Sequence, residues 1–451
     1  MSQGAFGIVS ILVVIPKLSN TDLGYIAALE TLTYLFATAA GFNLDRAASR
    51  FYFDSENEAN QKDLFTTLNL FSVMTVGLCV TLVVIFRFAV ARVFPTLTFW
   101  PLMVLGLARI SLDIAGRIEQ SYLVASGRSG RFAFGTILSG AIMIASASYM
   151  VVWLSYGVIG YLLAQVIAAL FLLVFLGLAS WHVRGWGRWQ GSILSEALSY
   201  AWPFAPTLVV AWVMSYYDRI LVGRRFGIET LGVYGLSLRF AAPLLLVSTA
   251  ITRAIYPTFY SVYGSTEAGP SERLAFARSV IYVFGALALS AMTIGRMVFH
   301  VAYGTRADEA LTYFAFIIVT YWISAVAFLS SESLMLAKAT KANMVLGLGC
   351  AAVSLGLNYL LIPMAGIKGA VASGAITALG AFGAQLYLAR RYITFAIPAR
   401  SYAYVLAVLV TTALVSASCR STWSVALLFV VGVALLGRGV VISTSFLRAH
   451  G

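Results

Sequence analysis

Long apolar runs recur from one end of the sequence to the other, and each is long enough to cross a membrane. A transmembrane helix needs about 20 predominantly apolar residues, and such runs fill most of this 451-residue chain. Only 10% of its residues are charged, whereas a soluble protein carries about 25%. Because a helix satisfies its own backbone hydrogen bonds in lipid, the sequence predicts an all-α membrane protein.

The runs predict about 14 transmembrane helices. The first, 2–15, is short and has no basic segment before it, so we expect the natural N-terminus to lie upstream of Met1. A polar loop is expected at 43–63, and a tryptophan-bearing joint between two halves at 182–197. The other expected spans are 22–42, 64–86, 98–124, 132–155, 158–181, 198–220, 231–255, 275–300, 308–336, 342–362, 369–389, 401–418 and 423–445.

An internal repeat is the most informative feature of the sequence, because three short motifs of the first half recur at nearly one separation in the second half. Each copy holds an even number of expected spans, so both copies enter the membrane from the same side, as in the parallel repeats of transporters. We therefore predict two six-helix lobes around a central cavity, 1–190 and 191–396, and two additional helices in 397–451. The recurring motifs are Leu23-Gly24 with Leu231-Gly232, Phe51-Tyr52 with Phe259-Tyr260, and Gly157-Val-Ile-Gly160 with Gly366-Ile-Lys-Gly369.

The excess of basic residues, 30 Lys and Arg against 17 Asp and Glu, indicates membrane topology. Most of the basic residues lie in short loops between apolar runs, which argues against a nucleic-acid partner. They are more numerous on the side of the N-terminus, and this bias predicts that both termini are cytoplasmic.

Motifs of enzymes and of cofactor or metal sites are not found in the sequence. There is no Gly-rich phosphate loop, paired-histidine zinc helix or Gly-x-Ser-x-Gly elbow. The histidines are isolated, and the cysteines are expected to pack as small apolar residues. We therefore predict a protein that is not an enzyme, has no cofactor and holds no metal.

Charged residues inside the expected spans are the candidate functional residues, because each costs about 2.5–3.5 kcal/mol on insertion scales. The fourth span carries Arg109, Asp113 and Arg117, whose spacing of four places them on one arc of a helix, where Asp113 can pair with either arginine. Glu119 falls on another face of that helix. Further charged residues in the expected spans are Glu30, Arg239, Glu332 and the Asp218-Arg219 pair at the end of the seventh span.

Each of these residues also has a structural interpretation. The Arg109–Asp113–Arg117 series would serve equally well as a ladder that locks two helices together, and Asp218-Arg219 would anchor a helix end at the interface. Glu30 and Arg239 lie nearer the middle of their spans, where a charged tip reaches water less easily. A surplus of arginine in a cavity suits an anionic ligand, since guanidinium binds phosphate through two parallel hydrogen bonds.

Short motifs along nearly the whole chain also follow the order and spacing of a known family. They are Gly41-Phe42, Arg50-Phe-Tyr52, Tyr200-Ala-Trp-Pro203, Asp218-Arg219 with Gly223, Leu231-Gly-Val-Tyr234, Tyr256-Pro257, Asn358-Tyr-Leu-Leu-Ile-Pro363 and Gly366-Ile-Lys-Gly-Ala370. In these motifs the chain resembles polysaccharide-biosynthesis flippases of the Wzx type, in the multidrug/oligosaccharidyl-lipid/polysaccharide exporter (MOP) superfamily. It departs from them at the N-terminus, where their basic lead is missing.

The resemblance implies a two-lobed bundle in the bacterial plasma (inner) membrane that alternates between inward- and outward-facing states. Its implied cargo is an oligosaccharide on polyprenyl pyrophosphate, for lipopolysaccharide or exopolysaccharide synthesis. We expect Arg239, Arg109 and Arg117 to bind the head group, and Asp113 and Glu30 to orient them or carry a coupling proton or sodium ion. Asp218 and Arg219 are assigned to an outer gate or to structure. Other polysaccharide-assembly proteins are expected partners.

Three alternatives stay open at this point. A drug or cation antiporter of the same superfamily would need an acidic cavity. A flippase for peptidoglycan precursors differs in whether its loss is lethal. A membrane polymerase or ligase would need a long external loop with catalytic residues, and none of the expected outer loops is long.

Overall fold

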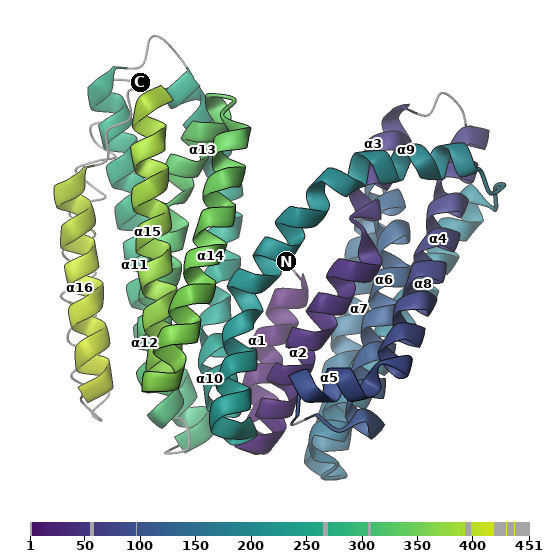
Figure 1. Ribbon diagram of the computed structural model, residues 1–451, viewed down its shortest axis with the longest axis horizontal. Coiled ribbons are helices and arrows are strands. Elements are labelled where there is room, and N and C mark those ends of the chain that lie inside the picture. The colour runs from purple at the N-terminus through teal and green to yellow at the C-terminus, as the bar shows by residue number, and fades with distance from the viewer. Residues whose placement is uncertain are drawn as a thin grey trace. The chain divides into compact units, whose positions relative to one another are not determined.

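The computed structural model describes residues 2–54, 58–95, 97–264, 269–304, 308–392 and 398–418, together with residues 430 and 437. All regular elements of this part of the chain are helices (Figure 1). They form two compact units, Met1–Gly232 and Val233–Gly451, called here the first and second unit. The predicted lobe boundaries at 190 and 396 stay predictions.

The first unit contains ten α-helices, of which the last continues into the second unit. Short helical turns join them at Ile15–Lys17, Phe99–Met103, Ser148–Trp153 and Trp202–Phe204. The α-helices are α1 Ser2–Val13, α2 Asn20–Gly41, α3 Leu44–Asp54, α4 Glu58–Ile85, α5 Arg87–Val93, α6 Val104–Ala125, α7 Ser129–Ala147, α8 Gly157–Arg184, α9 Gly191–Ala201 and α10 Ala205–Gly264.

The second unit holds the remainder of α10 and the helices that follow it. In Figure 1, α11, α12, α14, α15 and α16 run side by side in this unit, where α12 packs on α11, α15 and α16. The bounds are α11 Pro270–Tyr303, α12 Asp308–Val326, α13 Phe328–Leu336, α14 Thr340–Ala365, α15 Ile367–Tyr392 and α16 Ala399–Ser418.

The predicted number of spans is close to what the structure contains. Eleven helical segments of the described residues are long and apolar enough to cross a membrane. One of them is α10, in which two helices meet at a kink at Gly227 (φ 88°). These two helices correspond to most of the span predicted at 198–220 and to the span predicted at 231–255. The short α1 accounts for the predicted first span. The span predicted at 423–445 lies almost entirely outside the described residues.

The loop predicted at 43–63 is wrong in part, because Leu44–Asp54 forms helix α3. Leu44, Ala47 and Ala48 are buried at helical spacing, and this narrow apolar face is enough to dock a polar helix. The expected joint at 182–197 similarly ends in α9. Average hydropathy missed α3 because its outward face is polar.

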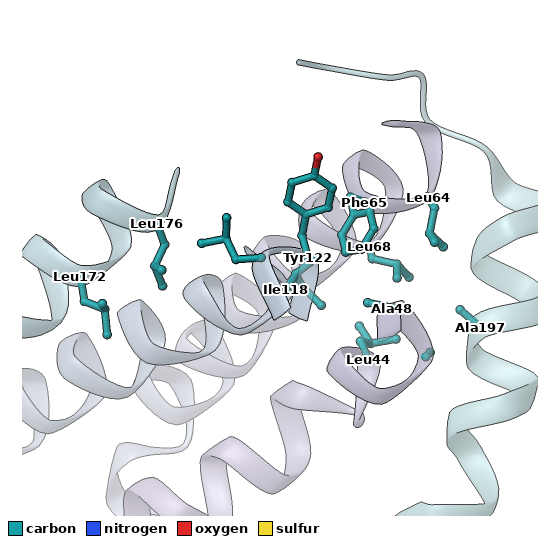
Figure 2. Packing of buried hydrophobic residues seen from close by; sticks show 12 residues of the cluster. Leu44, Ala48, Leu64, Phe65, Leu68, Ile118, Tyr122, Leu172, Leu176 and Ala197 are labelled. Atoms are coloured by element: carbon teal, nitrogen blue, oxygen red, sulfur yellow. The ribbon is translucent and has the colours of Figure 1, made fainter. Parts of the chain in front are cut away.

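The buried cluster beneath α3 joins five helices of the first unit (Figure 2). Phe65 of α4 is fully buried, and its ring lies 5.0 Å from the ring of Tyr122 on α6. Tyr52 of α3 also packs edge-on against Tyr122, at 6.2 Å. Leucines of α8 and Ala197 of α9 complete the cluster.

Two glycines of the repeat motifs lie at turns where the backbone has a positive φ. Gly157 begins α8 with φ 55°, and Gly366 precedes α15 with φ 59°. Residues with a Cβ rarely adopt this left-handed region. In both units the tight turn forms a helical hairpin, α7 with α8 and α14 with α15. The same turn chemistry therefore recurs in both copies of the repeat.

Residues 185–190, within the expected joint, are held by hydrogen bonds to the start of α4. The backbone N–H groups of Gly187, Arg188 and Gln190 donate to Thr66 Oγ1 (2.9 Å), Asp63 Oδ1 (2.6 Å) and Thr67 Oγ1 (3.0 Å). The Gln190 side chain also donates to Asp63 Oδ2. The joint is thus docked onto the first unit along this stretch.

We expect Asp63→Ala to lower the free energy of unfolding of the purified protein in detergent by about 1–3 kcal/mol, since it leaves the Arg188 N–H and the Gln190 side-chain amide without their acceptor. Asp54→Ala is the matched control, because its partner Arg50 is an exposed neighbour on the same helix and such pairs contribute about 0.3–0.5 kcal/mol. Equal melting temperatures for the two variants would contradict the docking role of Asp63.

Candidate functional site

Helix α6 carries the predicted series of charges, and the structure pairs two of them. Arg109 Nη2 lies 3.2 Å from Asp113 Oδ2, and the two side chains are 36% and 29% exposed. Both lie on a helix of membrane-spanning length. A half-exposed ion pair facing lipid would be costly, so this face of α6 is expected to border water or a polar ligand.

Arg117, one turn further along α6, makes no ion pair with any described residue. Its Nη1 atom lies 3.5 Å from the position that a Cβ on Gly41 would occupy. Gly41 is the last residue of α2, and the C-terminal end of a helix favours a nearby cation. Asp113 therefore neutralises Arg109, while Arg117 lies near the C-terminal end of α2, which favours its positive charge.

Glu119 faces another side of α6, as predicted. It is 8% exposed and accepts a 2.6 Å hydrogen bond from Asn69 Nδ2 of α4. Glu119 is thus held in the packed interior between two helices.

Glu30 of α2 pairs with Arg219 of α10, a partner that was not predicted from the sequence. Arg219 Nη1 lies 3.4 Å from Glu30 Oε2, and the two side chains are 14% and 35% exposed. The guanidinium of Arg219 lies over the ring of Tyr216, 4.5 Å from its centroid. Tyr216 in turn stacks on Tyr34 of α2 at 4.7 Å.

The same two helices are joined by further contacts around this pair. Trp212 Nε1 donates to the backbone oxygen of Thr31 at 3.1 Å. Asp218 accepts a hydrogen bond from the backbone N–H of Arg219 at 2.8 Å. A small pocket opens beside Arg219 and is also lined by Arg224, Ala28 and Thr31. We call this set of contacts between α2 and the first part of α10 the seam.

Arg239 lies in the second unit, on the part of α10 that follows Gly232, and its side chain is half-buried. The three arginines that were predicted to bind the head group therefore do not all belong to one unit. Arg109 and Arg117 share α6 of the first unit, and Arg239 is placed in the second unit alone.

Two groups of contacts in the second unit were not predicted from the sequence. Glu332 of α13 accepts hydrogen bonds from the hydroxyls of Tyr256 (3.3 Å) and Tyr260 (3.0 Å) on α10. Arg296 of α11 is 8% exposed and donates to Ser416 Oγ of α16 at 2.9 Å. The recurrence of Phe-Tyr at 259–260 was the available signal for the first group, and the charge of Arg296 inside the expected span 275–300 was the signal for the second.

Within the described residues, no group of three or more His, Cys, Asp or Glu side chains is arranged to hold a metal ion. The site is a set of paired and partly paired charges on helices of membrane-spanning length. Such an arrangement is suited to binding and releasing an ionic ligand.

Solved structures with the same fold are transporters. A lipid II flippase MurJ in an inward closed conformation superposes with a TM-score of 0.71, at 13% identity, over 99% of this chain and 97% of that one. An inward-facing multidrug resistance MATE family transporter of the MOP superfamily gives a TM-score of 0.57, at 15% identity, over 87% and 95%. At these identities the likeness establishes the fold.

A third related structure is a MOP superfamily transporter from Pyrococcus furiosus, described as having a binding pocket of reverse polarity that suggests a different function. Its TM-score is 0.50 at 12% identity, over 87% of this chain and 92% of that one. No curated protein sequence matches the chain.

A family model for polysaccharide biosynthesis proteins matches residues 17–312, well over half of the chain. This match and the shared fold confirm the resemblance drawn from the sequence motifs. The chain belongs to the polysaccharide biosynthesis protein family, and it shares the fold of the MurJ flippase and of MOP superfamily transporters.

Proposed function

We propose that this protein moves an oligosaccharide linked to polyprenyl pyrophosphate across the bacterial plasma membrane, by alternating access, for surface polysaccharide synthesis. The family match over residues 17–312 carries the proposal. Both termini are cytoplasmic in this proposal, as the bias of the basic loop residues predicts.

The chemistry of the cargo fits the charges in the spans. A pyrophosphate does not cross hydrocarbon unaided, because an ionised group loses its hydration there. Guanidinium groups replace that hydration with charge-assisted hydrogen bonds. The polyprenyl tail, being apolar, stays in the bilayer while the head group crosses.

The Arg109–Asp113 pair on α6 affects how available each of the proposed arginines is to the head group. Asp113 already occupies Arg109 at 3.2 Å, so binding through Arg109 has to compete with that pair. Arg117 has no ion-pair partner among the described residues and is the stronger candidate. Arg239 stays a candidate from the second unit, and Asp113 is proposed to orient Arg109.

Glu30 and Arg219 are proposed to act together as part of an outer gate. Their 3.4 Å contact joins α2 to α10, so opening the seam requires that this pair separates. A proton that neutralises Glu30 would weaken the pair. An anionic head group that competes for Arg219 would weaken it as well. Coupling by a proton or a sodium ion at Glu30 is therefore proposed as part of the gate.

A peptidoglycan-precursor flippase is the second candidate function, favoured by the structural likeness to the lipid II flippase MurJ. Both candidates move a polyprenyl pyrophosphate, so the binding chemistry is shared. Deletion of the gene separates them. Our proposal predicts a viable strain that lacks surface polysaccharide and accumulates lipid-linked repeat units on the inner leaflet. A lethal deletion would favour the second candidate.

We expect Arg117→Ala and Arg239→Ala to abolish complementation of the deletion strain at normal protein level. Arg109→Ala should have a smaller effect, because Arg109 is already paired. Arg117→Lys should restore part of the activity, since it keeps the charge but loses the two-pronged geometry. Arg87→Ala is the control, because Arg87 is exposed on α5. Full complementation by Arg117→Ala would remove this residue from the proposed site.

The gate pair is tested by a double-mutant cycle. Glu30→Gln and Arg219→Gln should each lower thermal stability, since each leaves a partly buried charge alone. The double variant should be more stable than the sum of the single effects predicts, by on the order of 1 kcal/mol. Strictly additive melting shifts would mean that Glu30 and Arg219 do not act as a pair.

A further inference from the structure

Two glycines bring the backbones of α2 and α10 into direct contact within the first unit. A Cβ on Gly24 would lie 1.9 Å from the carbonyl oxygen of Ile228, and a Cβ on Gly232 would lie 1.8 Å from the carbonyl oxygen of Asn20. Real Cβ atoms are essentially never found within 3.0 Å of another atom in this way. Neither position accepts a side chain unless the two helices move apart.

The contact is reciprocal. Gly24 packs on the residue one helical turn before Gly232, and Gly232 packs on the residue one turn before Gly24. Such an exchange, in which residue i meets j and j meets i, is the signature of a twofold axis. Gly24 and Gly232 are also the equivalent positions of the sequence repeat. The two copies of the repeat therefore meet here through the same surface.

The Gly24–Gly232 crossing and the seam join the same two helices, α2 and α10. Gly24 lies in the first turns of α2, and Gly232 follows the bend of α10 at Gly227. With the proposed topology, both glycines lie at the outer ends of their spans. Glu30, Tyr34 and their partners on α10 continue the same helix contact toward the middle of the membrane.

We propose that the Gly24–Gly232 crossing is the outer seal of the transport path, which closes when the two backbones touch and opens when they part. Glycine suits a contact that must form repeatedly, because no side chain has to be ordered or desolvated each time. The inference rests on the proposed alternating access, but it does not depend on which cargo is carried.

Alanine at either glycine should hold the seal open. Thr31, which is fully buried and lines the pocket in the seam, serves as the reporter when it is replaced by cysteine. In a background without Cys79, Cys350 and Cys419, a membrane-impermeant maleimide added outside should label Thr31→Cys about tenfold faster in Gly24→Ala or Gly232→Ala. The added methyl group overpacks the closed seal, and the resulting strain disfavours the closed state by an amount that corresponds to this factor.

Gly77→Ala is the matched control, because a Cβ on Gly77 would meet nothing within 4 Å. The two seal variants should behave alike, and the double variant should label no faster than either, since the helices are already apart. Labelling that stays at the level of Gly77→Ala in both single variants would overturn the proposal. This readout needs no cargo, so it is independent of a wrong cargo assignment.

A second experiment keeps both glycines. It tests whether the seam has to open even if the alanine variants fail to reach the membrane. Tyr34 and Tyr216 stack across the seam with ring centroids 4.7 Å apart. In Tyr34→Cys/Tyr216→Cys, a short bifunctional thiol reagent with a reducible link should stop complementation, and a reductant should restore it. The single cysteine variants should be unaffected by the reagent. Transport by the cross-linked protein at the rate of the single variants would show that the seam need not open.

Discussion

An ionised side chain in hydrocarbon must be neutralised, hydrated or bound, and this constraint explains how the charges of the protein are arranged. In the packed interior, Glu119 is held by Asn69 and Arg296 by Ser416, and both are buried. Arg109–Asp113 and Glu30–Arg219 are instead paired and partly exposed. The second kind of arrangement keeps charges available without leaving them alone, as a binding or gating residue requires.

The repeat is maintained by backbone geometry more than by side-chain chemistry. Gly157 and Gly366 both have a positive φ at the turn of a helical hairpin, and Gly24 and Gly232 meet in a reciprocal contact. Side chains around these points differ freely between the copies. A few glycines are therefore enough to reveal the duplication in the sequence, although most other positions have diverged.

Much of the fold could be predicted from hydropathy, because lipid requires continuous apolar helices. The expected spans 22–42, 98–124 and 342–362 correspond closely to helices of the structure. Hydropathy could not reveal α3, whose polar face lowers the average, nor that α9 precedes the seventh span as a separate helix. The spans expected at 198–220 and 231–255 lie on either side of the kink at Gly227.

The candidate site was predicted less completely than the fold. Spacing on one helix predicted the Arg109–Asp113 pair, because residues four apart always lie close together. The pairing of Glu30 with Arg219 depends on how α2 packs on α10, and sequence spacing contains no such information. Glu332 has tyrosine partners for the same reason. Local geometry is thus readable from the chain, whereas contacts between helices require the structure.

The most direct measurement is reconstitution of the purified protein into vesicles that carry a polyprenyl-pyrophosphate oligosaccharide. An oligosaccharide-modifying enzyme added outside reports which leaflet holds the lipid. The account predicts that the protein moves the lipid between leaflets and that the variant without the Arg117 guanidinium does not. Movement no faster than in protein-free vesicles, under an imposed proton or sodium gradient, would contradict it.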